Sequence, residues 1–186
     1  KLGSYTLTAG NSSNQSYSGV ISGTGSFTKS GAGSLTLSGA NTFTGDTSID
    51  GGSLVVSGGL SDSSDVVVGS SGSYELGASD TVSSISGSGA IKLGSYTLTA
   101  GNSSNQSYSG VISGTGAFTK SGTGSLTLSG ANTYTGDTSI DGGSLVVSGG
   151  LSESSDVVVA SSGSYELGAS DTVSSISGSG EIKLGS

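Results

Sequence analysis

The sequence predicts an all-β protein, built as a β-solenoid of about eight coils. The first observation is the stretch Gly33–Gly58, in which leucine, isoleucine and valine alternate with serine or threonine between glycine corners. The second is that this stretch returns almost unchanged as Gly124–Gly149. Alternation with a period of two residues is typical of strands, and self-similarity at a fixed period is typical of stacked repeats.

The composition supports strands over helices. Glycine supplies 36 of the 186 residues, which disfavours long helices. A chain rich in glycine and serine could also be disordered. Disordered linkers, however, do not place aliphatic side chains at alternate positions.

The chain consists of two copies of a 91-residue repeat, residues 1–91 and 92–182, followed by the first four residues of a third copy, 183–186. We expect the copies to form one continuous solenoid. The copies differ at six positions, none of which holds leucine, isoleucine or valine: Ser26/Ala117, Ala32/Thr123, Phe43/Tyr134, Asp62/Glu153, Gly69/Ala160 and Ala90/Glu181. The change from Ala90 to Glu181 indicates that this position lies on the outside, where a charged side chain meets water. Because side chains alternate along a strand, the next residue, Ile91 or Ile182, then points inward.

Candidate strands follow one another through the first copy. They are Tyr5–Thr8, Gly19–Ser22, Ser26–Lys29, Ser34–Ser38, Thr47–Asp50, Ser53–Ser57, Asp65–Gly69, Ser73–Leu76, Thr81–Ile85 and Ala90–Leu93. The residues expected to point inward are Tyr5, Leu7, Val20, Phe27, Leu35, Leu37, Ile49, Leu54, Val56, Val66, Val68, Leu76, Val82, Ile85, Ile91 and Leu93. Serine, threonine, aspartate, glutamate and lysine are expected on the outside.

Short strands of this kind could also form a β-sandwich, which would make the chain two beads on a string. Each candidate strand offers only one or two aliphatic residues, and the turns are similar throughout, so the solenoid is favoured. With about 20 to 23 residues per coil, each copy makes about four coils. At the spacing of neighbouring strands, each copy then adds about 19 Å to the rod.

The residues of the repeated stretch resemble a known family. They are similar to the autotransporter-associated β-strand repeat, also called the passenger-associated transport repeat, of type V secreted bacterial surface proteins. The residues that carry the resemblance are Gly31, Gly33, Leu35, Leu37, Gly39, Asn41, Phe43, Gly45, Thr47, Ile49, Gly52 and Leu54, with Gly122, Gly124, Leu126, Leu128, Gly130, Asn132, Tyr134, Gly136, Thr138, Ile140, Gly143 and Leu145 in the second copy. Phe43 departs from the family's tyrosine. The strong motif covers about a third of the chain.

The resemblance implies a right-handed parallel β-helix in a passenger that is exported across the bacterial outer membrane. It places the protein at the bacterial cell surface or in the secreted fraction, where the repeat serves as a stalk. A chain without cysteine or proline suits export through a pore, since neither a disulfide nor a slowly isomerising bond would hinder it.

The charge limits the range of partners. A formal net charge of −8 argues against nucleic acid and anionic membrane surfaces, both of which attract clustered lysine or arginine. No apolar run reaches the ~18 residues of a membrane span, so direct membrane insertion is not expected. No signal peptide opens the chain, which looks like a piece of something longer.

The sequence offers few parts for an enzyme. Histidine, cysteine and arginine are absent, which removes the usual components of hydrolytic triads and transition-metal sites. The carboxylate pairs Asp46/Asp50 and Asp62/Asp65 recur 91 residues later, and we interpret them as solvated turn residues. The run Ser61–Asp65 lacks the glycine and aspartate pattern of a calcium-binding repeat. We interpret Gly23–Gly25 as a turn and not as a phosphate-binding loop, since no helix follows it. We therefore expect no catalytic, cofactor-binding or metal-binding residues, and no cofactor.

Several polar and aromatic residues have structural interpretations. Asn41 and Asn132 are expected to hold left-handed turns and to bond the backbone between coils. Edge-of-core packing is favoured over sugar stacking for the tyrosines Tyr5, Tyr17 and Tyr74. Asn11 and Asn14 lie in glycosylation sequons, which matter only in a eukaryotic host. The threonines form no regular array of the ice-binding kind.

The sequence therefore predicts a non-enzymatic stalk or spacer segment that extends and rigidifies a surface protein and aids its export. The alternative is a binding module that uses the side of the rod to hold glycans or a matching rod. The expected partners are neighbouring repeats, and glycans of a host or cell surface are further candidates. Because the chain shows no capping element, end-to-end self-association is also expected.

Overall fold

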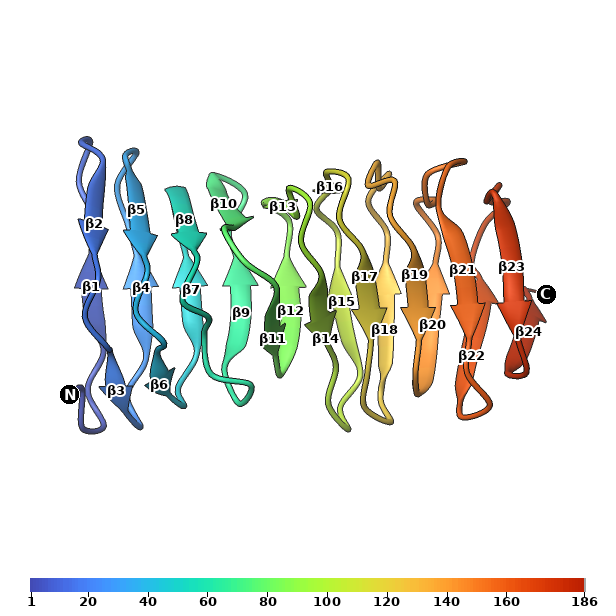
Figure 1. Ribbon diagram of the computed structural model, residues 1–186, viewed down its shortest axis with the longest axis horizontal. Helices are drawn as coiled ribbons and strands as arrows, with labels where there is room; N and C mark the ends of the chain where they lie inside the picture. The colour runs from blue at the N-terminus through green and yellow to red at the C-terminus, as the bar shows by residue number, and fades with distance from the viewer. Residues whose placement is uncertain (186) are drawn as a thin grey trace.

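The computed structural model describes residues 1–185, and none of these residues is helical. The strands run across an elongated rod, with the two termini at opposite ends of its long axis (Figure 1). Stacked strands pair in parallel, as they must when a chain coils in one direction. The prediction of an all-β parallel solenoid is confirmed, and the number of turns is about nine.

The first face of the rod is a ten-stranded sheet that runs through both copies. Its strands, in spatial order, are β1 (Leu7–Ala9), β4 (Phe27–Lys29), β7 (Thr47–Ile49), β9 (Asp65–Val68), β12 (Ser84–Gly87), β15 (Gln106–Tyr108), β18 (Ser125–Leu128), β20 (Gly143–Val147), β22 (Gly163–Leu167) and β24 (Glu181–Leu184).

The second face is a six-stranded sheet. It contains β2 (Gln15–Tyr17), β5 (Ser34–Leu37), β8 (Gly52–Val56), β10 (Gly72–Leu76), β13 (Ala90–Lys92) and β16 (Ile112–Ser113).

The third face begins with a two-stranded sheet and continues with a second sheet of six strands. The strands are β3 (Ser22–Gly23) and β6 (Thr42–Phe43), then β11 (Asp80–Val82), β14 (Leu98–Ala100), β17 (Phe118–Lys120), β19 (Thr138–Ile140), β21 (Asp156–Val159) and β23 (Ser175–Gly178). Residues 58–64 carry no strand, but hydrogen bonds from Asn41 N to Gly59 O and from Leu60 N to Asp80 bridge the gap.

The core consists of side chains stacked in register from coil to coil. On the first face, Leu7, Phe27, Thr47, Val66 and Ile85 follow one another along the rod. Each strand alternates inward and outward side chains, so the inward residues of the three faces, most of them aliphatic or aromatic, meet along the axis. The predicted inward aliphatic residues belong to this cluster, except Leu7, which is 41% exposed, and Val20, which is described below.

The coils are shorter than the sequence indicated. Most stacked partners are 19 or 20 residues apart, as in Phe27 with Thr47 and Thr47 with Val66. Each copy therefore makes about four and two-thirds turns, where four were predicted, and adds about 22 Å, where about 19 Å was predicted.

Two residues predicted to be inward point outward. Tyr5 is 79% exposed because the strand begins at Leu7, and Val20 is 52% exposed because its neighbour Ile21 takes the inward position. The sequence also missed β2 and β15, whose polar Gln-Ser-Tyr segments contain no aliphatic residue. The predicted start of a third copy, 183–186, ends at Ser186, which lies outside the described residues.

Candidate functional site

The polar groups inside the rod are the first place to look for a site. Asn41 is only 4% exposed and bonds three coils together. Its Oδ1 accepts from Ile21 N at 3.1 Å, and its Nδ2 donates to Gly39 O at 2.8 Å and to Gly59 O at 3.0 Å. All positive φ angles in the described chain belong to glycine, so the predicted left-handed conformation of Asn41 is wrong, whereas the predicted inter-coil bonding is present. Asn132 makes the same set of bonds in the second copy.

Asp80 lies further along the third face and, like Asn41, bonds one coil to another. Its carboxylate accepts from Leu60 N, from Thr81 N and from the hydroxyl of Tyr74, whose oxygen lies 2.5 Å away. Burial raises the pKa of Asp80, although the hydrogen bonds it accepts oppose this shift. Burial also raises the pKa of Tyr74 well above its ordinary value, and the negative charge of Asp80 adds to the effect. These shifts follow from a structural contact, because both groups bond within the rod and face no cleft.

A buried lysine occupies an inward position on the first face. Lys29 is 1% exposed and lies between Ala9 and Ile49 in the stack. Its ammonium donates to three main-chain carbonyls, Ser30 O at 2.6 Å and Gly31 O and Gly51 O at 2.9 Å. Burial lowers the pKa of Lys29. This ammonium joins two successive corners, so the expectation that lysines lie outside is wrong here, and Lys120 repeats the arrangement.

A buried chain of hydroxyl groups lies beside the phenylalanine that departs from the family motif. Thr47 Oγ1 is 3.1 Å from Ser64 Oγ, which donates to Gly45 O at 2.8 Å. In the second copy, Tyr134 replaces Phe43, and its hydroxyl lies 2.6 Å from Thr138 Oγ1. The tyrosine therefore extends this chain by one hydroxyl, while the phenylalanine leaves it shorter.

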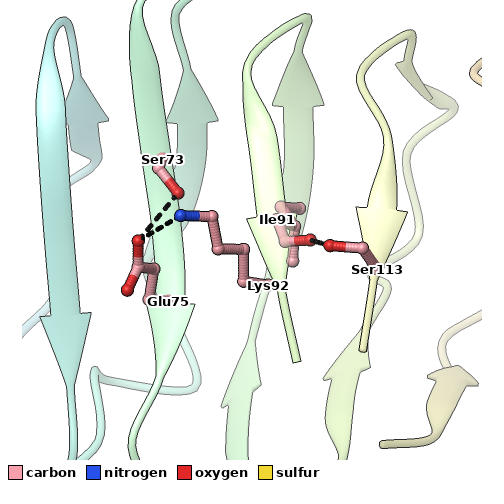
Figure 2. Close-up of polar contacts among 5 residues, drawn as sticks. All are labelled: Ser73, Glu75, Ile91, Lys92 and Ser113. Atoms are coloured by element: carbon pink, nitrogen blue, oxygen red, sulfur yellow. Dashed lines mark hydrogen bonds and ion pairs between the residues drawn. The ribbon is translucent and has the colours of Figure 1, made fainter. Parts of the chain in front are cut away.

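The junction between the two copies carries an ion pair. Glu75 on β10 and Lys92 on β13 are register partners, and Lys92 Nζ donates to Glu75 Oε1 at 2.7 Å, as Figure 2 shows. Ser73 donates to the same oxygen at 3.3 Å. Burial alone would raise the pKa of Glu75, but the hydrogen bonds from Lys92 and the serine hydroxyls together lower it. The pair joins β10 of the first copy to the first residue of the second.

The predicted carboxylate pairs do not form a site. Asp46 and Asp50 are exposed at opposite ends of β7, and Asp62 is exposed on a turn. Asp65 accepts a hydrogen bond from Ser84 on the next coil at 2.7 Å. Within residues 1–185, no three acidic side chains come together in a group that could hold a metal ion.

The tyrosines divide between core and surface. Tyr74 is fully buried, and Tyr108 is buried with its hydroxyl donated to Gly89 O at 2.5 Å. Tyr17, the equivalent of Tyr108, is 49% exposed. Tyr5 and Tyr96 project from a turn and are 79% and 38% exposed. Core packing therefore explains some of the tyrosines, but not this pair.

The remaining candidates lie on turns and outer rows. Asn11 is exposed and accepts from Ser13 N, and Asn14 accepts from Ser34 N on the next coil. An added Cβ on Gly25 would clash with the Tyr5 carbonyl, which agrees with a close turn. The outward residues Thr81, Thr99 and Thr119 are successive register partners on the third face, with one threonine per strand.

The surface is long, acidic and shallow. Of the five lysines, two are buried and one pairs with Glu75, so most of the 13 acidic residues have no cationic partner from this chain's side chains. An apolar hollow lies at the N-terminal end of the rod, has a volume of about 340 Å³ and is lined by Leu2, Leu7, Tyr17, Val20 and Leu35 among others. No helix in residues 1–185 has the length and apolar character to cross a membrane.

Comparison with known proteins agrees with this geometry. The model of the family described as Passenger-associated-transport-repeat matches residues 27–56 and 118–147, which contain β4 to β8 and β17 to β20. The adhesin BmaC autotransporter of Brucella suis biovar 1 (strain 1330) is 38% identical over an aligned length of 140 residues, and the match covers 69% of this chain. The chain spans only 4% of the length of that relative. No solved structure matches the chain.

The matched segments carry the buried asparagine, the buried lysine and the threonine of the hydroxyl chain. The same coil-to-coil bonds occur in both segments, so the sequence motif corresponds to a repeated set of contacts between coils. The chain is thus a segment of the autotransporter-passenger type, and at these two stretches it belongs to the passenger-associated-transport-repeat family.

Proposed function

We propose that this segment is a non-enzymatic stalk of a bacterial surface or secreted protein, one that extends and rigidifies the protein and aids its export. The observation that carries the proposal is the ten-stranded sheet, in which β12 of the first copy pairs directly with β15 of the second. A sheet that crosses the boundary between copies resists bending there. Copy number would then set the length of the rod.

The interior supports this role. The core residues stack from coil to coil, and the buried asparagines and lysines also bond one coil to the next. Both kinds of contact therefore stabilise the rod along its long axis. A single coil buries too few aliphatic residues to offset the entropy of ordering its backbone, so each coil depends on its neighbours. An export-competent chain benefits from this dependence, since it stays unfolded until several coils have emerged.

Small-angle scattering on chains of two, three and four copies tests the stalk. We expect the longest dimension to grow by about 22 Å per copy at a constant cross-section. Larger and variable increments with a flexible profile would mean that the copies are separate beads, and the stalk proposal would fall.

The binding alternative has one observation in its favour. Tyr5 and Tyr96 expose an aromatic ring at the same turn of each copy, and aromatic faces stack on sugars. The measurement is saturable binding to a glycan panel, with Tyr5→Ala/Tyr96→Ala as the test and Val67→Ala/Val158→Ala, which also removes exposed apolar groups, as the control. Saturable binding that only the tyrosine variant loses would favour the binding module. Absence of saturable binding would favour the stalk.

We also propose that the isolated chain associates end to end with a second copy of itself. Two side chains of the N-terminal hollow, Leu7 and Tyr17, have buried equivalents in the second copy, Leu98 and Tyr108, because the last coils of the first copy cover them. Leu7→Asp should reduce association in sedimentation experiments between micromolar and millimolar concentration, whereas Val111→Asp, at an exposed valine within the rod, should not. A monodisperse monomer at millimolar concentration would contradict this proposal.

A further inference from the structure

Equivalent residues of the two copies lie on different faces of the rod. The strands β1, β4, β7, β9 and β12 of the first copy belong to the first face, but their equivalents β14, β17, β19, β21 and β23 belong to the third. The strands β2, β5, β8, β10 and β13 belong to the second face, and their equivalents β15, β18, β20, β22 and β24 belong to the first. Each copy is therefore turned by one face relative to the copy before it.

The bonds of the buried asparagines show the same change of face. Asn41 bonds the turns of the third face, where Ile21 and Gly59 supply its partners. Asn132 bonds Ile112, which lies in β16 of the second face. The same inter-coil contact thus moves from one face to another between copies.

The rotation between copies arises because one copy does not contain a whole number of turns. A copy supplies five strands to each of two faces and four positions to the other, the strandless residues 58–64 being one of these four. Three faces make one turn, so a copy of about four and two-thirds turns ends one face short of a whole number. Three copies, about 270 residues, are needed before the repeat returns to the same face, which corresponds to about 67 Å of rod.

We propose that a tandem array of this repeat displays every exposed side chain on its three faces in rotation. A binding feature carried by the repeat then points in three directions around the rod and recurs on one side only in every third copy. This arrangement suits partners small enough to occupy one copy each. A flat partner that lies along one side, such as a second rod, would meet equivalent residues only about every 67 Å. Neighbouring copies therefore cannot present the same binding residues side by side to such a partner.

Val67 and Val158 provide a direct test, because they are equivalent residues and are 38% and 37% exposed. Val67 lies on the first face in β9, and Val158 lies on the third in β21. Their separation along the axis is about 22 Å. Glu166 lies on the first face in β22, five strands beyond Val67 in the same outward row, at about 24 Å along the axis.

The 186-residue chain contains no cysteine, so paired spin labels can be placed without other changes. We expect pulsed dipolar spectroscopy to give a longer distance for Val67→Cys/Val158→Cys than for Val67→Cys/Glu166→Cys, although the first pair is closer along the axis. A first-pair distance equal to or shorter than the second would place equivalent residues on one face and overturn the proposal.

Two further pairs of labelled positions serve as controls. Thr81→Cys/Val158→Cys joins two residues of one row on the third face, four strands apart, and should give the shortest distance of all. Ser48→Cys/Ser139→Cys repeats the comparison of equivalent residues in case a valine variant folds poorly, and it should also exceed the pair on a single face. The inference rests on the proposed rod of tandem copies. Scattering tests the rod and these distances test the rotation, so the two can fail separately.

Discussion

The hydroxyl of Tyr134 lies 2.6 Å from Thr138 Oγ1, whereas Phe43, at the equivalent position, leaves Thr47 bonded to Ser64 alone. Both rings are fully buried, and each tilts against a phenylalanine, Phe27 or Phe118, at a centroid distance of 6.2 or 6.4 Å. The two copies thus offer the same packed site with and without one hydrogen bond.

Removing the hydroxyl of Tyr134 measures how much its hydrogen bond contributes to stability. Tyr134→Phe should lower the free energy of unfolding by about 0.5–1.5 kcal/mol, the usual net value of a buried hydrogen bond. Phe43→Tyr should change stability in the opposite direction by a similar or smaller amount, since the ring already fits. Denaturant titration followed by circular dichroism measures both. Equal stability of Tyr134→Phe and the parent chain would show that the bond contributes nothing.

The buried ammonium of Lys29 should matter more. Lys29→Met keeps most of the apolar chain but leaves the carbonyls of Ser30, Gly31 and Gly51 without this donor. We expect a loss of about 2–3 kcal/mol in the free energy of unfolding, because buried acceptors lose a charged partner. The control is Lys92→Met, which removes the half-exposed pair with Glu75 and should cost less than about 1 kcal/mol. Similar losses for the two variants would contradict the structural role of Lys29.

The architecture of the rod was largely predictable from the sequence. Alternation in segments such as Ser34–Ser38 and Ser53–Ser57 identified β5 and β8, and glycine corners with a repeat indicated coiling. The position of Lys29 could have been read from the same rule, since Phe27 inward and Thr28 outward require residue 29 to point inward. We placed it outside because lysine is rarely buried without a partner, and here the partners are carbonyl groups.

The rotation between copies and the corner bonds could not be predicted in the same way. The third face has few aliphatic residues between Phe43 and Val82, so the sequence does not mark where each turn ends. Asp80 accepts a bond from a tyrosine only six residues away, yet it also bonds Leu60 on another coil, and local patterns contain no sign of that contact. Exposure of Tyr5 likewise depends on where the strand begins.

The corner asparagine gives a prediction with a matched control. Asn41→Asp replaces the Nδ2 donor by an oxygen that faces Gly39 O and Gly59 O, so a buried charge would meet two carbonyl groups. We expect a loss of about 2–3 kcal/mol in the free energy of unfolding. Asn11→Asp keeps the acceptor that Ser13 N uses and lies on the surface, so it should change stability by less than about 0.5 kcal/mol. The structure would be contradicted if Asn41→Asp were as mild as its control.

The buried tyrosines predict loss of stability in alkaline solution. Burial raises the pKa of Tyr74, Tyr108, Tyr134 and Tyr165 above the ordinary value in the folded rod. A group whose pKa is raised on folding contributes stability that is present below its unfolded pKa, about 10 for tyrosine, and is lost as the pH rises further. A tyrosine that stays protonated in the fold should cost about 1.4 kcal/mol by pH 11. The lowered pKa of Lys29 and Lys120 acts in the opposite direction and offsets part of this loss.

Denaturant titrations at pH 8 and pH 11 measure the difference. Tyr108→Phe should lower stability at pH 8 through the lost bond to Gly89, but it should reduce the fall between the two pH values, because one ionising group has been removed. Tyr5→Phe removes a tyrosine that is 79% exposed and should leave the fall unchanged. If the parent chain were equally stable at both pH values, or if Tyr5→Phe and Tyr108→Phe behaved alike, burial of the phenol groups would not control the alkaline response.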